Sequence, residues 1–182
     1  MRVNQTGLIH LQEKKAFDGL TLFTPLWKNK TFLIDMSGKV VHEWELPGTP
    51  GGYARLIENG NLVYSANTGH KKGAPFSGGA QGGLLREVDW NGNIINEFFD
   101  PWQHHDFHKL ENGNWIYAGW SIMPDEISCR ITGGIEGSNR DEGIYNDYIR
   151  EVTPSGEIVW QWNSQDLEIE KYPIFPLYPR HV

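Results

Sequence analysis

A pair of adjacent histidines followed by an acidic residue and a third histidine is the group in this sequence best suited to chemistry. These residues are His104, His105, Asp106 and His108. An imidazole changes protonation state near neutral pH, so it can act as a general acid, a general base or a nucleophile. In a regular strand only alternate side chains share a face. We therefore expect His104, Asp106 and His108 to converge and His105 to point away.

Three interpretations of these residues stay open when only residue types are considered. They could be ordinary strand-end residues whose imidazoles bond to loop carbonyls. They could bind a metal such as zinc, since imidazole and carboxylate are common ligands, although the sequence holds no second ligand cluster. They could also form a site for an anion or a phenolate, in which the imidazoles donate to an oxyanion or react with it.

An internal repeat indicates where this group lies. Residues 51–61 align with residues 104–114 at a period of about 50 residues, and both contain a Glu-Asn-Gly-Asn turn. In this alignment the Gly-Gly-Tyr at 51–53 corresponds to the paired histidines and Asp106, and Arg55 corresponds to His108. Arg55 is therefore a second candidate for binding an anion, or for a salt bridge between repeats.

A second pattern, in which a β-rich run, a glycine turn and another β-rich run follow one another, recurs at 32–44, 85–95 and 149–162. Each copy predicts a hairpin, because the glycine supplies the positive φ that a tight reversal needs. Two hairpins in each period give four strands. A period near 50 residues with four strands and frequent aromatic residues is typical of β-propeller blades.

The predicted fold is therefore all-β, a partial β-propeller of about three four-stranded blades in a single domain, residues 1–182. The blades are expected at 6–46, 51–99 and 104–163, and the tail 164–182 would lead towards a missing blade. Gly-rich insertions at 70–83 and 123–147 would interrupt the second and third blades.

Three blades do not close a ring, since the smallest common propellers have about four. We expect the polypeptide to continue past Val182, or open blade edges to favour self-association. The first strand of a blade is the innermost, which would place the histidine pair at a mouth of the central channel, where ligands bind.

The charge and cysteine content of the sequence limit the kinds of partner and the cellular setting that we expect. The formal net charge of −7 and the pI near 5.5 provide no basic surface for a phosphate backbone, so we expect no nucleic acid. The single cysteine, Cys129, can form no internal disulfide. The sequence shows neither a signal peptide nor a run of about 18 apolar residues, so we expect a cytoplasmic location for the chain as given and no membrane association.

Three stretches, at 19–25, 32–44 and 104–114, together resemble the arylsulfotransferases of the bacterial aryl-sulfate sulfotransferase type. The Leu-Ile-Asp-Met-x-Gly-Lys-Val-Val-His-x-Trp stretch is the most specific of them. The likeness spans nearly the whole chain but only the N-terminal half of such a protein. It implies a six-bladed propeller that moves a sulfuryl group from a phenolic sulfate ester to a phenol acceptor. The family needs no cofactor, and its reaction passes through a sulfated histidine.

By this resemblance His105 is the catalytic candidate, one of the residues that hold the sulfuryl group, and His104 and Asp106 flank it. His108 and Arg55, from their positions in the repeat, join His104 and Asp106 as the substrate-binding candidates. The family's Asp-Trp-x-His-x-Asn segment, a later arginine and the sulfated histidine have no counterpart in this sequence. We therefore expect this chain alone to be inactive. The resemblance also allows an exported or periplasmic full-length form. The alternative is a non-catalytic propeller that binds a ligand or a protein through its channel mouth.

Overall fold

The fold was determined as a computed structural model, which describes residues 7–26, 28–48, 50–67, 81–138, 141 and 143–180. Strands dominate these residues, so the all-β prediction is confirmed. The strands are β1 (Thr21–Phe23), β2 (Lys30–Ile34), β3 (Val40–Glu45), β4 (Pro50–Leu56), β5 (Leu62–Asn67), β6 (Gly83–Val88), β7 (Ile94–Phe99), β8 (Gln103–Lys109), β9 (Trp115–Ile122), β10 (Gly133–Ile135), β11 (Tyr145–Val152), β12 (Ile158–Asn163) and β13 (Ile174–Pro179). The helical elements are α1 (Asp125–Ser128) and the 3-10 turns Ser164–Asp166 and Ile169–Lys171.

The strands form three antiparallel sheets and one parallel pair. The first sheet has the order β1-β2-β3, the second β4-β5-β6-β7 and the third β12-β11-β9-β8, whereas β10 pairs with β13 in parallel. The first sheet thus has three strands among the described residues, where four were expected. The segment before β1 contains the run Gln12-Glu13-Lys14-Lys15, whose polar side chains do not suit a pleated, half-buried surface, and it forms a turn.

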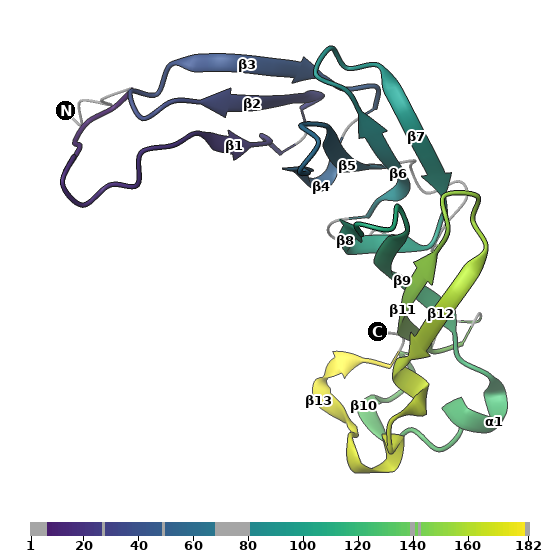
Figure 1. The fold of residues 1–182 in the computed structure, drawn as a ribbon. Helices are drawn as coiled ribbons and strands as arrows, with labels where there is room; N and C mark the ends of the chain where they lie inside the picture. Colours follow the sequence, from purple (N-terminus) through teal and green to yellow (C-terminus); the bar gives the residue numbers. More distant parts are fainter. Residues whose placement is uncertain are drawn as a thin grey trace.

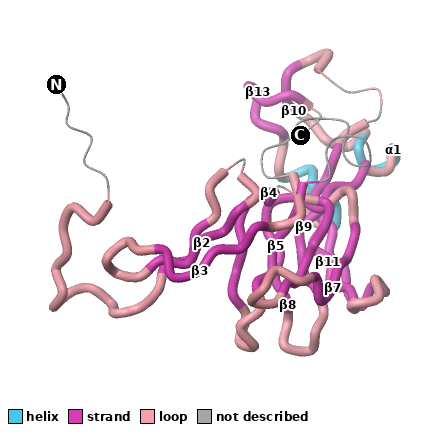
Figure 2. Tube along the Cα trace, turned by 90° about the horizontal axis from the view of Figure 1, so that it is seen from above, coloured by secondary structure: helices cyan, strands magenta, loops and turns pink. Residues whose placement is uncertain are grey.

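The sheets follow one another along an open arc, as Figure 1 shows. The first strand of each sheet, β1, β4 or β8, lies on the concave side of the arc, and β3, β7 and β12 lie on the convex side. β4 also contacts both β1 and β8 directly. In the view from above, the segment before β1 extends away from the body of strands (Figure 2).

Aspartates fix the β2–β3 and β6–β7 hairpins. Asp35 accepts hydrogen bonds from the backbone N–H groups of Ser37 and Lys39, at 2.9 and 3.0 Å. Asp89 accepts the equivalent bonds from Asn91 and Asn93, at 2.9 and 2.8 Å. Both aspartates therefore cap their turns, which explains why the two hairpins share a sequence pattern.

Two clusters of buried side chains hold the three sheets face to face. β5 is buried along almost its whole length because it packs on both sides. Leu62 and Tyr64 face a cluster that includes Trp44 of the first sheet, and Val63 faces a cluster that includes Phe107 of the third. The indole N–H of Trp44 also donates to the Asp89 carbonyl at 3.1 Å. The second sheet is thus the centre of the packed core.

A buried carboxylate joins the second sheet to the third. Asp100 follows β7, and its Oδ2 accepts hydrogen bonds from Tyr117 at 2.8 Å, from Tyr148 at 2.6 Å and from Arg150 at 3.1 Å. Burial, followed by the Asp100 charge, raises the pKa of both tyrosines, so they stay protonated as donors. A charge buried between sheets is tolerable because it is fully hydrogen-bonded.

The C-terminal segment does not extend the three antiparallel sheets within the described residues. Residues 174–179 form β13, which pairs with β10 in the segment between β9 and β11. Arg180 also donates to the Gly133 carbonyl at 2.7 Å. The tail expected to lead towards a further blade therefore folds back onto the connection that follows β9.

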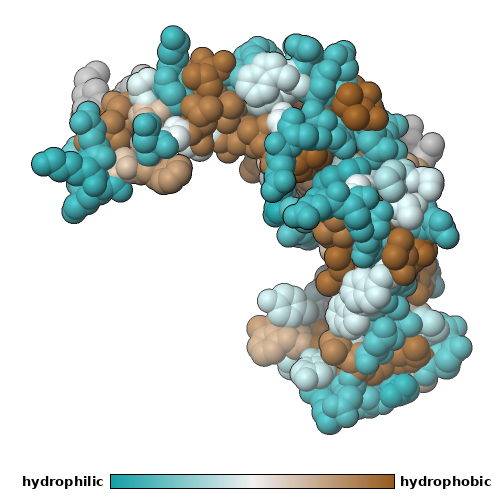
Figure 3. Space-filling model, in the orientation of Figure 1, coloured by the Kyte–Doolittle hydropathy of each residue, from teal (hydrophilic) through white to brown (hydrophobic). Residues whose placement is uncertain are grey.

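The surface of the arc mixes hydrophilic residues with apolar patches (Figure 3). Val40 and Val41 of β3 are about half exposed, as are Val159 and Trp160 of β12. Among the described residues, no helix has the length and apolar character needed to span a membrane.

Candidate functional site

A two-residue bulge at the start of β8 positions the histidine pair. Gln103 and His104 pair with Gly119 and Ala118 of β9, and the next pair is Phe107 with Tyr117. The residues between them, His105 and Asp106, have no partner in the register, and His105 adopts a left-handed φ of 50°. The two extra residues leave the flanking positions in register, so His104 and His108 still lie opposite Ala118 and Ile116 on the same face. Asp106 and His108 both approach Arg55, but His104 does not join them. His104 instead contacts His105, so the expectation that His105 points away is wrong.

The same irregularity occurs in the preceding repeat. In β4, Pro50 pairs with Ala66 and the next pair is Ala54 with Tyr64, so two extra residues lie on β4. In the repeat alignment, these β4 positions correspond to the positions of the β8 bulge. The bulge therefore belongs to the repeated scaffold. The two strands differ in the residues that the bulge carries. β8 has His104-His105-Asp106 where the sequence of β4 is Gly51-Gly52-Tyr53.

His104 is the most constrained of the candidates. Only 6% of it is exposed, and its ring stacks on Trp120 with the ring centroids 4.0 Å apart. Its Nε2 lies 3.1 Å from Asp147 Oδ1, and its Nδ1 lies 2.8 Å from His105 Nδ1. β8, β9 and β11 thus bring Asp147, His104 and His105 into a hydrogen-bonded row at one end of the third sheet.

His105 stands at the solvent end of this row. The residue as a whole is exposed, but partial burial of its ring, followed by the nearby His104, lowers its pKa, while the Asp147 carboxylate opposes the shift. Lowering the pKa below 6.5 favours the neutral imidazole at pH 7. A neutral imidazole has one nitrogen that donates and one that carries a lone pair, which a general base or nucleophile requires.

The remaining candidates form a second group beside the first. Arg55 of β4 has Nη1 3.3 Å from His108 Nδ1 and Nη2 3.5 Å from Asp106 Oδ1. These three residues, together with Ile116 and Ile149, line a hollow of about 190 Å³. The predicted site residues are therefore divided between the row that includes His104 and His105 and the charged group that includes Arg55.

Two residues of the site were missed in the sequence. Asp147 fell inside the expected insertion at 123–147, but it belongs to β11, which begins at Tyr145. Trp120 pairs with Asp147 across the sheet, which brings the indole and the carboxylate to the same histidine. The third hairpin pattern could have been extended back to 145, since Tyr145 and Tyr148 continue its β-rich run. The glycine-rich insertion, by contrast, falls largely on residues 68–80, outside the described residues.

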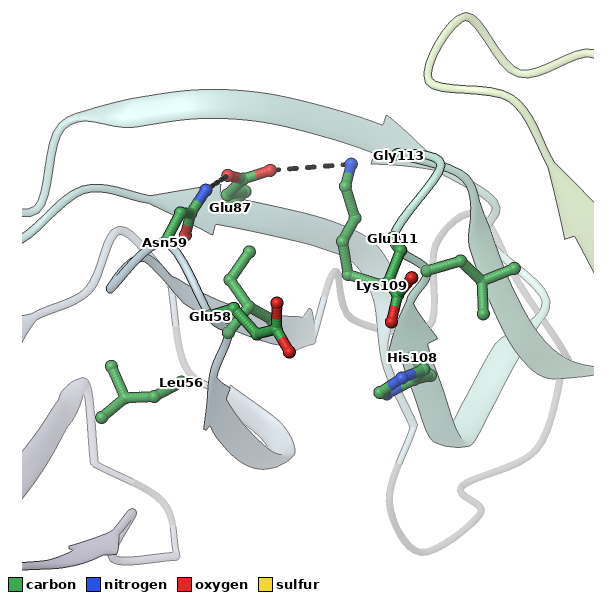
Figure 4. A pocket seen from close by; sticks show the side chains of 10 residues that line it. Leu56, Glu58, Asn59, Glu87, His108, Lys109, Glu111 and Gly113 are labelled. Atoms are coloured by element: carbon green, nitrogen blue, oxygen red, sulfur yellow. Dashed lines mark hydrogen bonds and ion pairs between the residues drawn. The ribbon is translucent and has the colours of Figure 1, made fainter.

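A larger hollow of about 600 Å³ lies between the turns that follow β4 and β8 (Figure 4). At its wall Glu87 and Lys109 pair at 3.6 Å, and both side chains are almost fully buried. Glu87 also accepts a hydrogen bond from Asn61 at 2.7 Å. Because these charges already satisfy each other, this hollow is explained as a gap between packed turns, at the ends of β4 and β8 that lie away from the imidazole pair.

Comparison with known proteins gives no family for this chain. No family model matches it, and no curated protein matches it. One similar solved structure is a protein of unknown function from Bacteroides caccae, with 15% sequence identity and a TM-score of 0.49. The match covers 83% of this chain and 48% of that protein, so the chain spans about half the length of that protein.

Proposed function

We propose that this chain carries part of a sulfuryl-transfer site of the arylsulfotransferase type, built on an incomplete β-propeller. In this proposal the segments 6–46, 51–99 and 104–163 are successive blades and the concave side of the arc is one wall of the central channel. The face-to-face packing of the sheets and the inner position of β1, β4 and β8 support this view.

The observation that carries the proposal is the row in which Asp147 of β11 contacts His104, and His104 contacts His105, both on β8, the innermost strand of the third sheet. The row orients the His105 imidazole, which stands on the bulge of β8. The equivalent bulge of β4 has no histidine, so the imidazoles are not needed to form the bulge. Bulges next to active sites commonly re-aim a side chain. A residue held at positive φ in spite of its Cβ is also more common at functional sites than elsewhere.

The chemistry of sulfuryl transfer suits these groups. A sulfuryl group in transfer spreads negative charge over its oxygens, so positioned donors and a local positive charge stabilise it. Arg55 supplies a permanent charge next to the row, and it would exchange its exposed contact with Asp106 for the sulfate oxygens. His105 would lie at the reacting end of the ester. Because the sequence has no counterpart of the family's sulfated histidine, we expect the chain alone to bind an aryl sulfate without turning it over.

Binding is the first test. We expect 4-nitrophenyl sulfate, titrated by calorimetry, to bind the purified chain, and His105→Ala to weaken the binding at least tenfold. His10→Ala is the matched control, because His10 is exposed in the segment before β1. No measurable binding, or equal binding by His105→Ala, would refute the proposal.

Transfer is tested separately by supplying the missing nucleophile. Imidazole attacking the sulfur of 4-nitrophenyl sulfate would break the ester's oxygen–sulfur bond and give N-sulfoimidazole, nitrophenolate and a proton released to the buffer. The nitrophenolate is followed by its absorbance. We expect release that requires added imidazole and is lost in His105→Ala. Rapid nitrophenolate release by the chain without added imidazole would contradict the expectation that the chain lacks the nucleophile. Binding without any imidazole-dependent release would favour the non-catalytic binding module instead.

A further inference from the structure

We infer that Asp147 and His104 act as positioning residues that hold His105 in the tautomer with its proton on Nδ1 and its lone pair on Nε2. The tautomer follows from the hydrogen bonds together with the burial of His104. Only the use made of the lone pair rests on the proposed function.

The assignment begins at the carboxylate. An ionised carboxylate can only accept hydrogen bonds, so His104 Nε2, 3.1 Å from Asp147 Oδ1, carries the proton and donates. His104 is buried, and a neutral ring avoids the cost of an additional buried charge. A neutral His104 with its proton on Nε2 has a lone pair on Nδ1. That nitrogen lies 2.8 Å from His105 Nδ1, so His105 must donate from Nδ1.

The surroundings keep the row in this arrangement. Trp120 stacks on the His104 ring with an interplanar angle of 24° and so restricts its rotation. The backbone N–H of Asp147 donates to Ser164 Oγ at 3.2 Å, which anchors the start of β11. The bulge fixes the backbone of His105 at a φ of 50°. Each member of the row is thus held by contacts outside it.

The result is a His105 imidazole whose Nε2 carries a lone pair that can accept a proton. In the proposed reaction, the acceptor phenol would give its proton to Nε2 as its oxygen bonds to sulfur and the nitrogen–sulfur bond of the sulfated nucleophile breaks. The same proton would pass to the phenolate that departs when that nucleophile next attacks a donor ester and the ester's oxygen–sulfur bond breaks. One bond is exchanged for another and the proton returns, so His105 ends each cycle neutral.

The tautomers can be read directly from long-range ¹H–¹⁵N correlation spectra of the histidine rings at pH 7. We expect His105 to show a protonated Nδ1 and an unprotonated Nε2, the form that free histidine disfavours, and His104 to show the reverse. In Asp147→Ala the His105 ring should shift towards the Nε2–H form, whereas Asp147→Asn, which keeps an acceptor oxygen, should retain part of the wild-type signature. Asp125→Ala, at an exposed carboxylate of α1, is the control and should leave both rings unchanged. A wild-type His105 with its proton on Nε2, or no change in Asp147→Ala, would overturn the inference.

Binding of 4-nitrophenyl sulfate by the same samples separates this inference from the function. The Nδ1–H tautomer without aryl sulfate binding would support the positioning row and refute the function. Aryl sulfate binding with His105 in the Nε2–H form would support the proposed function and refute the positioning row.

Discussion

Arg55 and His108 occupy equivalent positions in successive repeats, and their side chains meet with Nη1 and Nδ1 3.3 Å apart. The contact follows from the adjacency of β4 and β8, because a strand position repeated in neighbouring sheets recurs at the same height along the concave side. The repeat thus provides one cation and one imidazole side by side.

This contact gives a first prediction. The Arg55 pair with Asp106 is exposed, so Arg55→Ala should change the free energy of unfolding by no more than about 1 kcal/mol. Affinity for 4-nitrophenyl sulfate should nevertheless fall roughly tenfold, because a charge-assisted hydrogen bond to the anion is lost. Lys30→Ala, which removes another exposed pair, with Glu43, is the control for both measurements. Unchanged affinity in Arg55→Ala would show that Arg55 does not contact the aryl sulfate.

The backbone of His105 gives a second prediction. A residue with a Cβ at a φ of 50° is strained by roughly 1 kcal/mol, and glycine avoids this strain. Because alanine and glycine remove the same imidazole, His105→Gly should be more stable to urea than His105→Ala by about that amount, while both lose aryl sulfate binding. Equal stability of the two variants would show that the bulge imposes no strain.

The lowered pKa of His105 sets a pH dependence. The folded state binds this proton less readily than the unfolded state, so the stability present above pH 6.5 should decline as the pH falls from 6.5 towards the lower folded pKa. Urea unfolding of wild type and His105→Gly across this range isolates the contribution. The wild-type decline should exceed that of the variant; identical slopes would contradict the lowered pKa.

The buried Asp100 gives a prediction about the scaffold. Asp100→Ala would leave Arg150 and two tyrosine hydroxyls without their shared acceptor, so we expect a loss of about 3 kcal/mol or more. Tyr148→Phe removes only one donor and should cost about 1 to 2 kcal/mol. Denaturant unfolding measures both. A loss below that of Tyr148→Phe would show that Asp100 does not join the sheets.

The sequence allowed the hairpins to be predicted but not the geometry of the site. Asp35 and Asp89 act through residues two to four positions along the chain, so their turns are local and visible as a repeated pattern. The bulge depends on how β8 pairs with β9, and regular alternation could not predict that His105 turns back to contact His104. The two glycines at 51 and 52 were the available signal, since glycine within a strand often marks a bulge.

The role of Asp147 was beyond sequence reasoning for a different reason. It meets His104 from 43 positions away, and the insertion between β9 and β11 hid the start of its strand. The fold-back of residues 174–179 onto β10 was missed for the same reason, because a parallel pairing of two short strands leaves no turn between them in the sequence.

In the proposed function, the imidazole pair of β8 receives the sulfuryl end of an aryl ester. The most direct measurement follows the ring nitrogens of individually assigned histidines while 4-nitrophenyl sulfate is added. We expect saturable shifts at His105 and His104, smaller shifts at His108, and none at His10 or His42. His42 lies on β3, and its Nε2 is 2.9 Å from the Trp90 carbonyl oxygen in the turn between β6 and β7. Saturable binding that moves His42 or His10 and leaves His105 unchanged would contradict the account.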